Sequence, residues 1–223
     1  MHSNKIENYK KGLNLTKFQR EIIVGTLLGD GHLETSDKGK TFRLKIEHSI
    51  KQKEYVEWLH NQFKELVHGG IRIWTRSSKF PNGSTKISEK CGFTTFSLGF
   101  LRFYGQQFYQ NGTKMIPKMI EKLLTPNSIA IWFLDDGSFK SQKHRTFIIH
   151  SHGYTKNELK IVQKCFAKLG IKTRLHKQTR EKGVFWRIYV LSESAEKFAE
   201  MVKPIINQIP SMKYKLGNTL PKE

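Results

Sequence analysis

Two apolar segments that each end in Asp-Gly constrain the fold of this chain most. They read "TKFQREIIVGTLLGDG", which ends with Asp30 and its glycine, and "TPNSIAIWFLDDG", which ends with Asp136 and its glycine. Thr16 and Thr125 start the two segments and suit the N-cap of a helix, and the final glycines commonly stop one. We therefore expect two helices whose C-terminal ends present Asp30 and Asp136.

The elements expected after these two helices repeat in the same order. Each Asp-Gly end is followed by an alternating strand ("FRLKIEH" and "TFIIHS"), an amphipathic helix, two further strands and a final helix. The acids lie 106 residues apart (136 − 30), nearly half of the 223-residue chain. A repeat of this length indicates an α+β protein made of two similar half-domains, 1–115 and 116–223.

Small residues indicate how the two helices pack. Gly25 and Gly29 in "GTLLG" share one helical face, where the missing side chains allow another helix to approach closely. On the second helix the available small residue is Ala130. Helices packed side by side at the centre of a pseudo-twofold axis would bring Asp30 and Asp136 together.

The charge of the chain restricts its partners. Lys and Arg number 39 against 19 Asp and Glu, which gives a formal net charge of +20. Such an excess suits a polyanion, and nucleic acid is the leading candidate. An anionic membrane surface fits less well, because the cations are spread along the whole chain instead of forming one basic helix or tail.

Other classes of protein are excluded by composition. The two cysteines, Cys91 and Cys165, stand alone, so neither a disulfide framework nor a zinc site is expected. We find neither a targeting peptide nor an apolar run long enough to cross a membrane. An intracellular protein is therefore expected, in a mitochondrion, a chloroplast or a bacterial cytoplasm.

A carboxylate at the C-terminus of a helix faces the negative end of the helix dipole, where Lys or Arg would be more stable. Asp30 and Asp136 both occupy such a position. One Asp-Gly pair is ordinary turn chemistry, but two in equivalent places favour a shared divalent cation, for which carboxylate and carbonyl oxygens are suitable ligands.

The segments "IVGTLLGDG" (23–31) and "IAIWFLDDG" (129–137) resemble the two motif copies of single-chain LAGLIDADG homing endonucleases. The resemblance extends over nearly the whole chain, because the order of elements is also duplicated. It implies two half-domains, each a curved antiparallel sheet with helices on one face. It also implies a Mg²⁺-dependent monomer that cuts one phosphodiester on each strand of a long, asymmetric DNA site.

The resemblance further implies which residues bind metal. The last acid of each motif, Asp30 or Asp136, would bind two or three Mg²⁺ ions shared between the acidic clusters. The carbonyl before each acid, of Gly29 or Asp135, would be a further ligand.

Basic and polar residues near the acids follow from the same resemblance. Lys114 and Lys215 would form the pocket that offsets charge on the scissile phosphate, with Lys213 as the alternative to Lys215. Glu47 and His150, on the first strand of each half, would hold water beside the metal ions.

Alternating strands provide the surface expected to read DNA. In "FRLKIEH" the apolar residues face one way and the polar residues the other, and the later strands follow the same alternation. A sheet with cationic and amide side chains outward can enter a major groove. The expected contacts are Arg43, Lys45, Arg72, Trp74 and Arg76 in the first half and Arg174, His176, Gln178, Arg180 and Arg187 in the second.

Two alternatives use the same scaffold. The first is a maturase that binds intron RNA, and the second is a DNA-binding regulator without catalytic activity. The presence of both Asp30 and Asp136 argues against the regulator and only weakly against the maturase.

Overall fold

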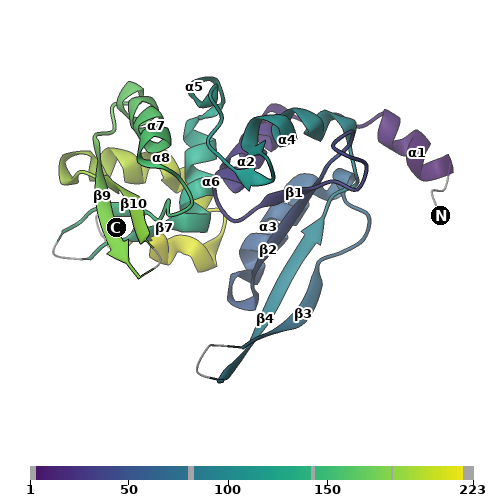
Figure 1. Cartoon of the computed structure of the whole chain (residues 1–223), viewed down its shortest axis with the longest axis horizontal. Helices are drawn as coiled ribbons and strands as arrows, with labels where there is room; N and C mark the ends of the chain where they lie inside the picture. Colours follow the sequence, from purple (N-terminus) through teal and green to yellow (C-terminus); the bar gives the residue numbers. More distant parts are fainter. Residues whose placement is uncertain (1–3, 80–82, 142–143, 182, 218–223) are drawn as a thin grey trace.

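The computed structural model describes residues 4–79, 83–141, 144–181 and 183–217, which form an α+β structure with one four-stranded antiparallel sheet in each half (Figure 1). The first sheet has the order β1-β2-β4-β3, and the second has the order β7-β8-β10-β9. Their strands are β1 (His32–Glu34), β2 (Arg43–Ser49), β3 (Arg72–Lys79) and β4 (Thr85–Thr94), then β7 (Gly137–Phe139), β8 (Phe147–Ile149), β9 (Thr173–Arg180) and β10 (Gly183–Val190). The equal order confirms the expected duplication.

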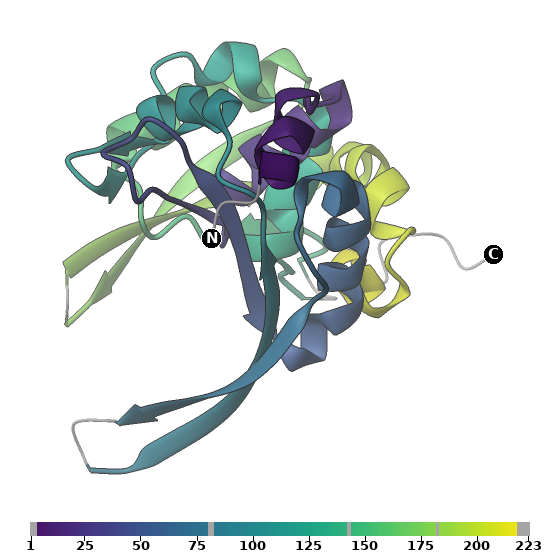
Figure 2. The same cartoon turned by 90° about the vertical axis from the view of Figure 1, so that its right-hand side faces the viewer.

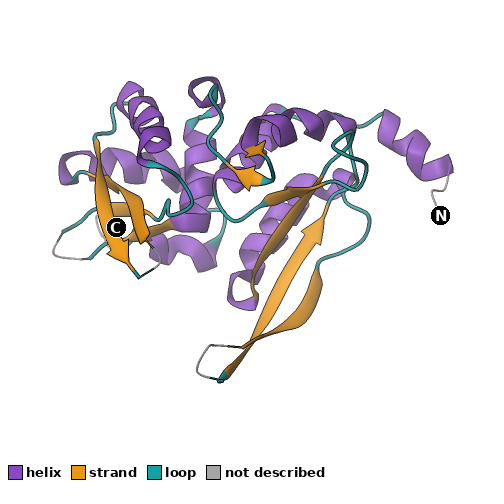
Figure 3. Cartoon of the chain, viewed as in Figure 1, coloured by secondary structure: helices purple, strands orange, loops and turns teal. Residues whose placement is uncertain are grey.

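Helices pack against these sheets, with α2 and α6 in contact between the two halves (Figure 3). They are α1 (Asn4–Lys11), α2 (Lys17–Leu28), α3 (Lys53–Phe63), α4 (Arg102–Phe108), α5 (Ile120–Leu123), α6 (Pro126–Asp136), α7 (Lys156–Lys168) and α8 (Ala195–Ile206). A two-residue ribbon, β5 (Tyr109–Gln110) with β6 (Thr113–Lys114), ends the first half, and a 3₁₀ segment, Pro210–Leu216, ends the second. Within the described ranges, no helix is both long and apolar enough to cross a membrane.

The two central helices, α2 and α6, begin at the predicted residues and pack against each other. Thr16 and Thr125 are their N-caps, and each forms a complete capping box with the residue three positions later. All residues from 21 to 28 of α2 and from 128 to 134 of α6 are buried. The two helices are therefore the shared core of both halves.

Glycines on α2 let α6 approach closely, as predicted. A Cβ atom built on Gly25 would lie 2.5 Å from both the Cβ of Ile131 and the carbonyl oxygen of Ser128. One built on Gly29 would lie 2.5 Å from the Cβ of Asp135. Such distances are far inside van der Waals contact, so any larger residue would push the helices apart. The expected partner, Ala130, is not among the atoms nearest to either glycine.

Several boundaries differ from the sequence prediction. Helix α2 ends at Leu28 with Gly29 as its C-cap, two residues before the predicted stop at Gly31. The pattern "FTTFSLG" places the second strand of the first hairpin at 93–99, but β4 starts at Thr85, because β3 and β4 stay paired to the end of their hairpin. Residues 80–82 of that hairpin lie outside the described residues.

Two short strands, β1 and β7, directly follow the Asp-Gly ends and were not predicted, since three residues are too few to show alternation. The strand that carries Glu47 is therefore the second of its half, β2. The assignment of His150 to a strand was wrong, because β8 ends at Ile149.

The hairpins of the two sheets extend to the same side of the molecule. In Figure 2 the β3–β4 hairpin (blue) and the β9–β10 hairpin (light green) both reach toward the left, whereas α3 and α8 lie toward the right.

Candidate active site

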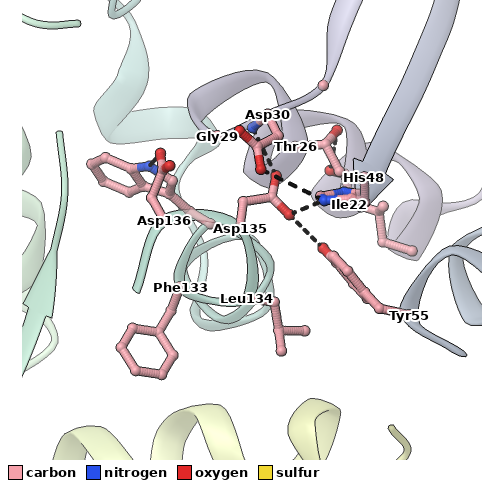
Figure 4. Close-up of polar contacts among 12 residues, drawn as sticks. Ile22, Thr26, Gly29, Asp30, His48, Tyr55, Phe133, Leu134, Asp135 and Asp136 are labelled. Carbon is pink, nitrogen blue, oxygen red and sulfur yellow. Dashed lines mark hydrogen bonds and ion pairs between the residues drawn. The ribbon is translucent and has the colours of Figure 1, made fainter. Parts of the chain in front are cut away.

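The C-terminal ends of α2 and α6 bring together the two acids singled out in the sequence (Figure 4). Asp30 follows the C-cap of α2, and its side chain is 51% exposed. Asp136 is the last residue of α6, and its Oδ2 accepts a hydrogen bond from the indole Nε1 of Trp132 at 3.1 Å. The site therefore combines one carboxylate from each half of the chain.

These acids repel each other in a poorly hydrated place. Burial, followed by the negative charge of Asp30, raises the pKa of Asp136 from 3.8 to about 7, despite the hydrogen bond from Trp132. An arrangement of this kind becomes favourable at neutral pH when a cation balances the carboxylates.

The side chain of Asp135 lies on the other side of α6 and faces α2. Its Oδ2 accepts a hydrogen bond from the backbone N–H of Asp30 at 3.0 Å, and its Oδ1 accepts one from the Tyr55 hydroxyl at 2.8 Å. The side chain is fully buried, and this burial, together with Asp30 nearby, raises its pKa well above the usual value. The sequence had pointed only to the carbonyl of this residue.

Sequence reasoning also missed His48. Its Nδ1 lies 3.6 Å from Oδ2 of Asp30, and its Nε2 lies 3.8 Å from Oδ1 of Asp135. The ring is buried, and Nε2 has no hydrogen-bond partner among the described residues. The sequence contains one indication of this position. His48 follows Leu44 and Ile46 in the alternation of β2 and therefore faces inward, where a polar residue is unusual.

A lysine from each half, the half-buried Lys114 or the buried Lys215, reaches the end of the central helix in its own half. Lys114, on β6, donates from Nζ to the carbonyl oxygens of Gly29 at 2.7 Å and Gly31 at 2.8 Å. Burial lowers the pKa of this lysine, although the three nearby aspartates oppose the shift. The ammonium group thus neutralises the negative end of α2.

Lys215, in the closing 3₁₀ segment, occupies the equivalent place at α6. Its Nζ donates to the carbonyl of Leu134 and to those of Phe133 and Asp135, at 3.3 and 3.2 Å. Burial lowers its pKa as well. The neighbouring Lys213 is exposed, so Lys215 is the lysine that lies in the site.

The donor set fits Mg²⁺. Within the described residues there is no cluster of three or more His, Cys, Asp and Glu side chains that could enclose a metal ion. Mg²⁺, however, usually binds through one or two carboxylates and completes its shell with water and substrate phosphate oxygens. Asp30 and Asp136 supply these carboxylates, and the carbonyls of Gly29 and Asp135, now bonded to lysines, each keep a second lone pair.

Comparison with known proteins agrees with this geometry. Residues 20–198 match the LAGLIDADG DNA endonuclease family. The chain belongs to this family.

Named relatives cover most of the chain. DNA endonuclease I-ChuI of Chlamydomonas applanata is 29% identical over 92% of this chain and 97% of its own length. Cytochrome b mRNA maturase bI2 of Debaryomyces hansenii is 30% identical over 95% of this chain and 77% of its own. The solved structure of homing endonuclease I-WcaI, bound to its DNA recognition sequence, has a TM-score of 0.81 and 28% identity over 96% of this chain and 93% of that one.

The other two residues that the LAGLIDADG resemblance suggested differ in position. His150 lines a cavity of about 300 Å³ together with Lys114 and Asp136, and its Nε2 lies 3.0 Å from the Ser138 hydroxyl. Burial, followed by nearby cations, lowers the pKa of His150, so the neutral ring is favoured at neutral pH. Glu47 is instead paired with Arg76, its Oε1 lying 3.5 Å from Nη1.

In the first half of this LAGLIDADG chain, all of the expected reading residues except Arg76 line a cavity of about 670 Å³ on the sheet. Arg43, Lys45, Arg72 and Trp74 contribute to its lining. The carboxylate of Glu34 lies 2.8 Å from Arg43 and 3.2 Å from Lys45, so these two cations are partly neutralised. Arg72 is the more available cation for a base or phosphate.

In the second half, strand pairing places His176 opposite Arg187 and Arg174 opposite Tyr189. The His176 ring stacks on Tyr189 with centroids 3.9 Å apart. The amide of Gln178 is satisfied when its nitrogen faces His152 Nε2 at 3.2 Å and its oxygen faces Arg180 Nε at 3.0 Å. These contacts order the polar face before any partner binds.

Proposed function

We propose that this LAGLIDADG endonuclease acts as a monomer that depends on Mg²⁺ and cuts one phosphodiester on each strand of a long, asymmetric DNA site. We further propose half-domains 1–115 and 116–223 and a location in an organelle or a bacterial cytoplasm. The observation that carries the proposal is the meeting of Asp30 and Asp136 at the ends of α2 and α6, with one lysine from each half beside them.

In the proposed mechanism, Asp30 and Asp136 hold the divalent ions. When bound, such ions activate water and balance charge on the reacting phosphate. Lys114 and Lys215 fix the helix ends and keep positive charge near the phosphate. His150, with its neutral ring beside Asp136, orients water through hydrogen bonds.

In the proposed complex, the duplex lies against the outer faces of the two sheets. The net charge of +20 supports this placement, as do the two hairpins that reach to one side (Figure 2). Each half carries different side chains on its face, so the two half-sites would differ in sequence. Glu47, paired with Arg76, would belong to this contact surface instead of holding water.

Selection of cleavable sites from a randomised DNA library, with Mg²⁺ or with EDTA, tests the proposal. We expect cleavage in Mg²⁺ only, at an asymmetric consensus. Arg72→Ala should relax the preference in one half-site and Arg174→Ala in the other, because a good contact to a base contributes about 1–3 kcal/mol of discrimination. A palindromic consensus bound by two chains would contradict the proposal.

A second candidate function is that of an intron RNA maturase. Helix α7 buries one face and exposes a row of lysines at four-residue spacing: Lys156, Lys160, Lys164 and Lys168. Such a row suits a phosphate backbone, and a relative is named as a maturase. Splicing of the host intron by the Asp30→Asn protein would support this function, and loss of splicing on Lys160→Glu with Lys164→Glu would locate it.

A further inference from the structure

The backbone around Asp30 leaves the helix before the acid is reached. The N–H of Gly29 donates to the carbonyls of Gly25 and Thr26, both at 3.1 Å, and the N–H of Gly31 donates to Thr26 at 2.8 Å. The N–H of Asp30 between them is bonded to a side chain, Oδ2 of Asp135. The position of Asp30 thus depends on a group from the other half of the chain.

Asp136 has a different support. It is the last residue of α6, so its backbone is part of the helix, and its carboxylate is held by Trp132 one turn earlier. The residue equivalent to Asp135 in the first motif is Gly29, which has no side chain and cannot hold Asp136 in return. The support of Asp30 by Asp135 therefore has no counterpart in the other half.

Asp135 is itself held in place. The Tyr55 hydroxyl donates to its Oδ1 at 2.8 Å, and Tyr55 and Asp135 are both fully buried. The ring of His48 lies 5.1 Å from that of Tyr55, and its Nε2 lies 3.8 Å from Oδ1 of Asp135. A buried side chain with a hydrogen bond to each of its two oxygens has little freedom to move, which a positioning residue requires.

We propose that Asp135, held by Tyr55, is a positioning residue for Asp30, and that cleavage of the two DNA strands therefore depends on different supporting side chains. This inference rests on the proposed role of Asp30 and Asp136 as metal ligands, one for each strand. Displacement of a reactive group by about 1 Å can cost about 10²-fold in rate. Loss of Asp135 would release the backbone of Asp30 and leave Asp136 in its helix.

The test follows each strand separately, with a duplex labelled differently on its two strands. Asp135→Ala should slow one strand about 10²-fold more than the other. Asp135→Asn keeps an oxygen that accepts from Asp30 and should restore most of the rate. Tyr55→Phe should give a smaller bias of the same direction.

Trp132→Phe is the matched variant for the other half, because it removes the indole N–H from Asp136. We expect it to give the opposite strand bias. DNA affinity in Ca²⁺ should stay within a few-fold of wild type for all these variants, and calorimetric titration of Mn²⁺ into the DNA complex of Asp135→Ala should show one weakened class of sites.

Equal slowing of both strands by Asp135→Ala would overturn the inference, because a purely structural defect acts on both. An Asp135→Asn protein as defective as Asp135→Ala would overturn it too. The proposed metal site is judged by a separate variant. If Asp30→Asn cleaved near the wild-type rate, the metal site would fail, whereas an inactive Asp30→Asn with an unbiased Asp135→Ala would reject the positioning role alone.

Discussion

The ends of the two central helices carry equivalent acids in unlike surroundings. At α2, the acid lies beyond the helix, its carboxylate is half exposed, and its backbone is bonded to Asp135. At α6, the acid belongs to the helix, its pKa is raised by burial, and its carboxylate is bonded to Trp132. In both halves a lysine donates to backbone carbonyls at the end of the helix or just beyond it.

This difference indicates which features of the duplicated site are the same in both halves and which have diverged. The positions of the acids and of the lysines follow from the repeated fold and recur in both halves. The groups that hold the acids in position, in contrast, depend on how the helices pack. The side chain of Asp135 on α6 occupies the space beside Gly29, which has no side chain. The two halves can therefore share one chemistry while their supporting residues diverge.

Removal of either acid should have the largest effect. We expect Asp30→Asn and Asp136→Asn each to lower the cleavage rate by about 10³-fold or more, since a lost metal ligand removes transition-state stabilisation. DNA affinity measured in Ca²⁺ should change little. Glu200→Gln, which removes an exposed carboxylate on α8, is the control and should cleave normally. If one acid proved dispensable, the two ends would not be functionally equivalent.

Removal of a lysine should come next. Lys114→Met and Lys215→Met should each slow cleavage by about 10²-fold, as expected for loss of a charged group beside the phosphate. Lys215→Met should also lower the melting temperature more than Lys114→Met, because the bonds that it loses to the Phe133 and Leu134 carbonyls are buried. Lys213→Met serves as the control, and an equal loss of activity there would contradict the assignment of Lys215.

The close packing of α2 against α6 can be tested by measuring the stability of the protein. Gly25→Ala should lower the free energy of unfolding by about 1–3 kcal/mol, because its Cβ would overlap Ser128 and Ile131. Gly99→Ala is a matched control, since no heavy atom lies within 4 Å of the added methyl group. Chemical denaturation of both variants measures the difference. Equal stabilities would mean that α2 and α6 pack less tightly than described.

A smaller effect should appear with pH in the metal-free protein. The folded-state pKa of Asp136 is raised from 3.8 to about 7, so its contribution to stability is lost as pH rises through 7. Asp136→Asn should therefore gain in melting temperature relative to wild type as the pH rises from 5 to 8. Scanning calorimetry in EDTA measures the gain, and a pH-independent difference would contradict the raised pKa.

Structural features that depend on residues close together in the sequence could mostly be predicted. The caps at Thr16 and Thr125, the glycine that ends α6, and the inward series of β2 all follow from residue types a few positions apart. Duplication of these signals was sufficient to predict two halves and two acids at equivalent places. The lysines could be placed near the acids only through the family resemblance.

The supporting contacts could not be predicted in the same way. Asp30 and Asp135 are 105 residues apart in the chain, and their hydrogen bond depends on how α6 rotates against α2. Likewise, the pairing of Glu47 with Arg76 arises from the sheet register and not from any local pattern. Such contacts become visible only when the packing of whole elements is known.

The central claim is that Asp30 and Asp136, at the adjoining ends of α2 and α6, hold the metal ions that act on the two DNA strands. A crystal structure of the protein with its DNA target and Mn²⁺, with anomalous scattering recorded at the manganese edge, tests it most directly. We expect anomalous peaks within ligand distance, about 2.2 Å, of a carboxylate oxygen of Asp30 and one of Asp136, with both scissile phosphates adjacent. Peaks bound elsewhere, or no peak at either aspartate, would contradict it.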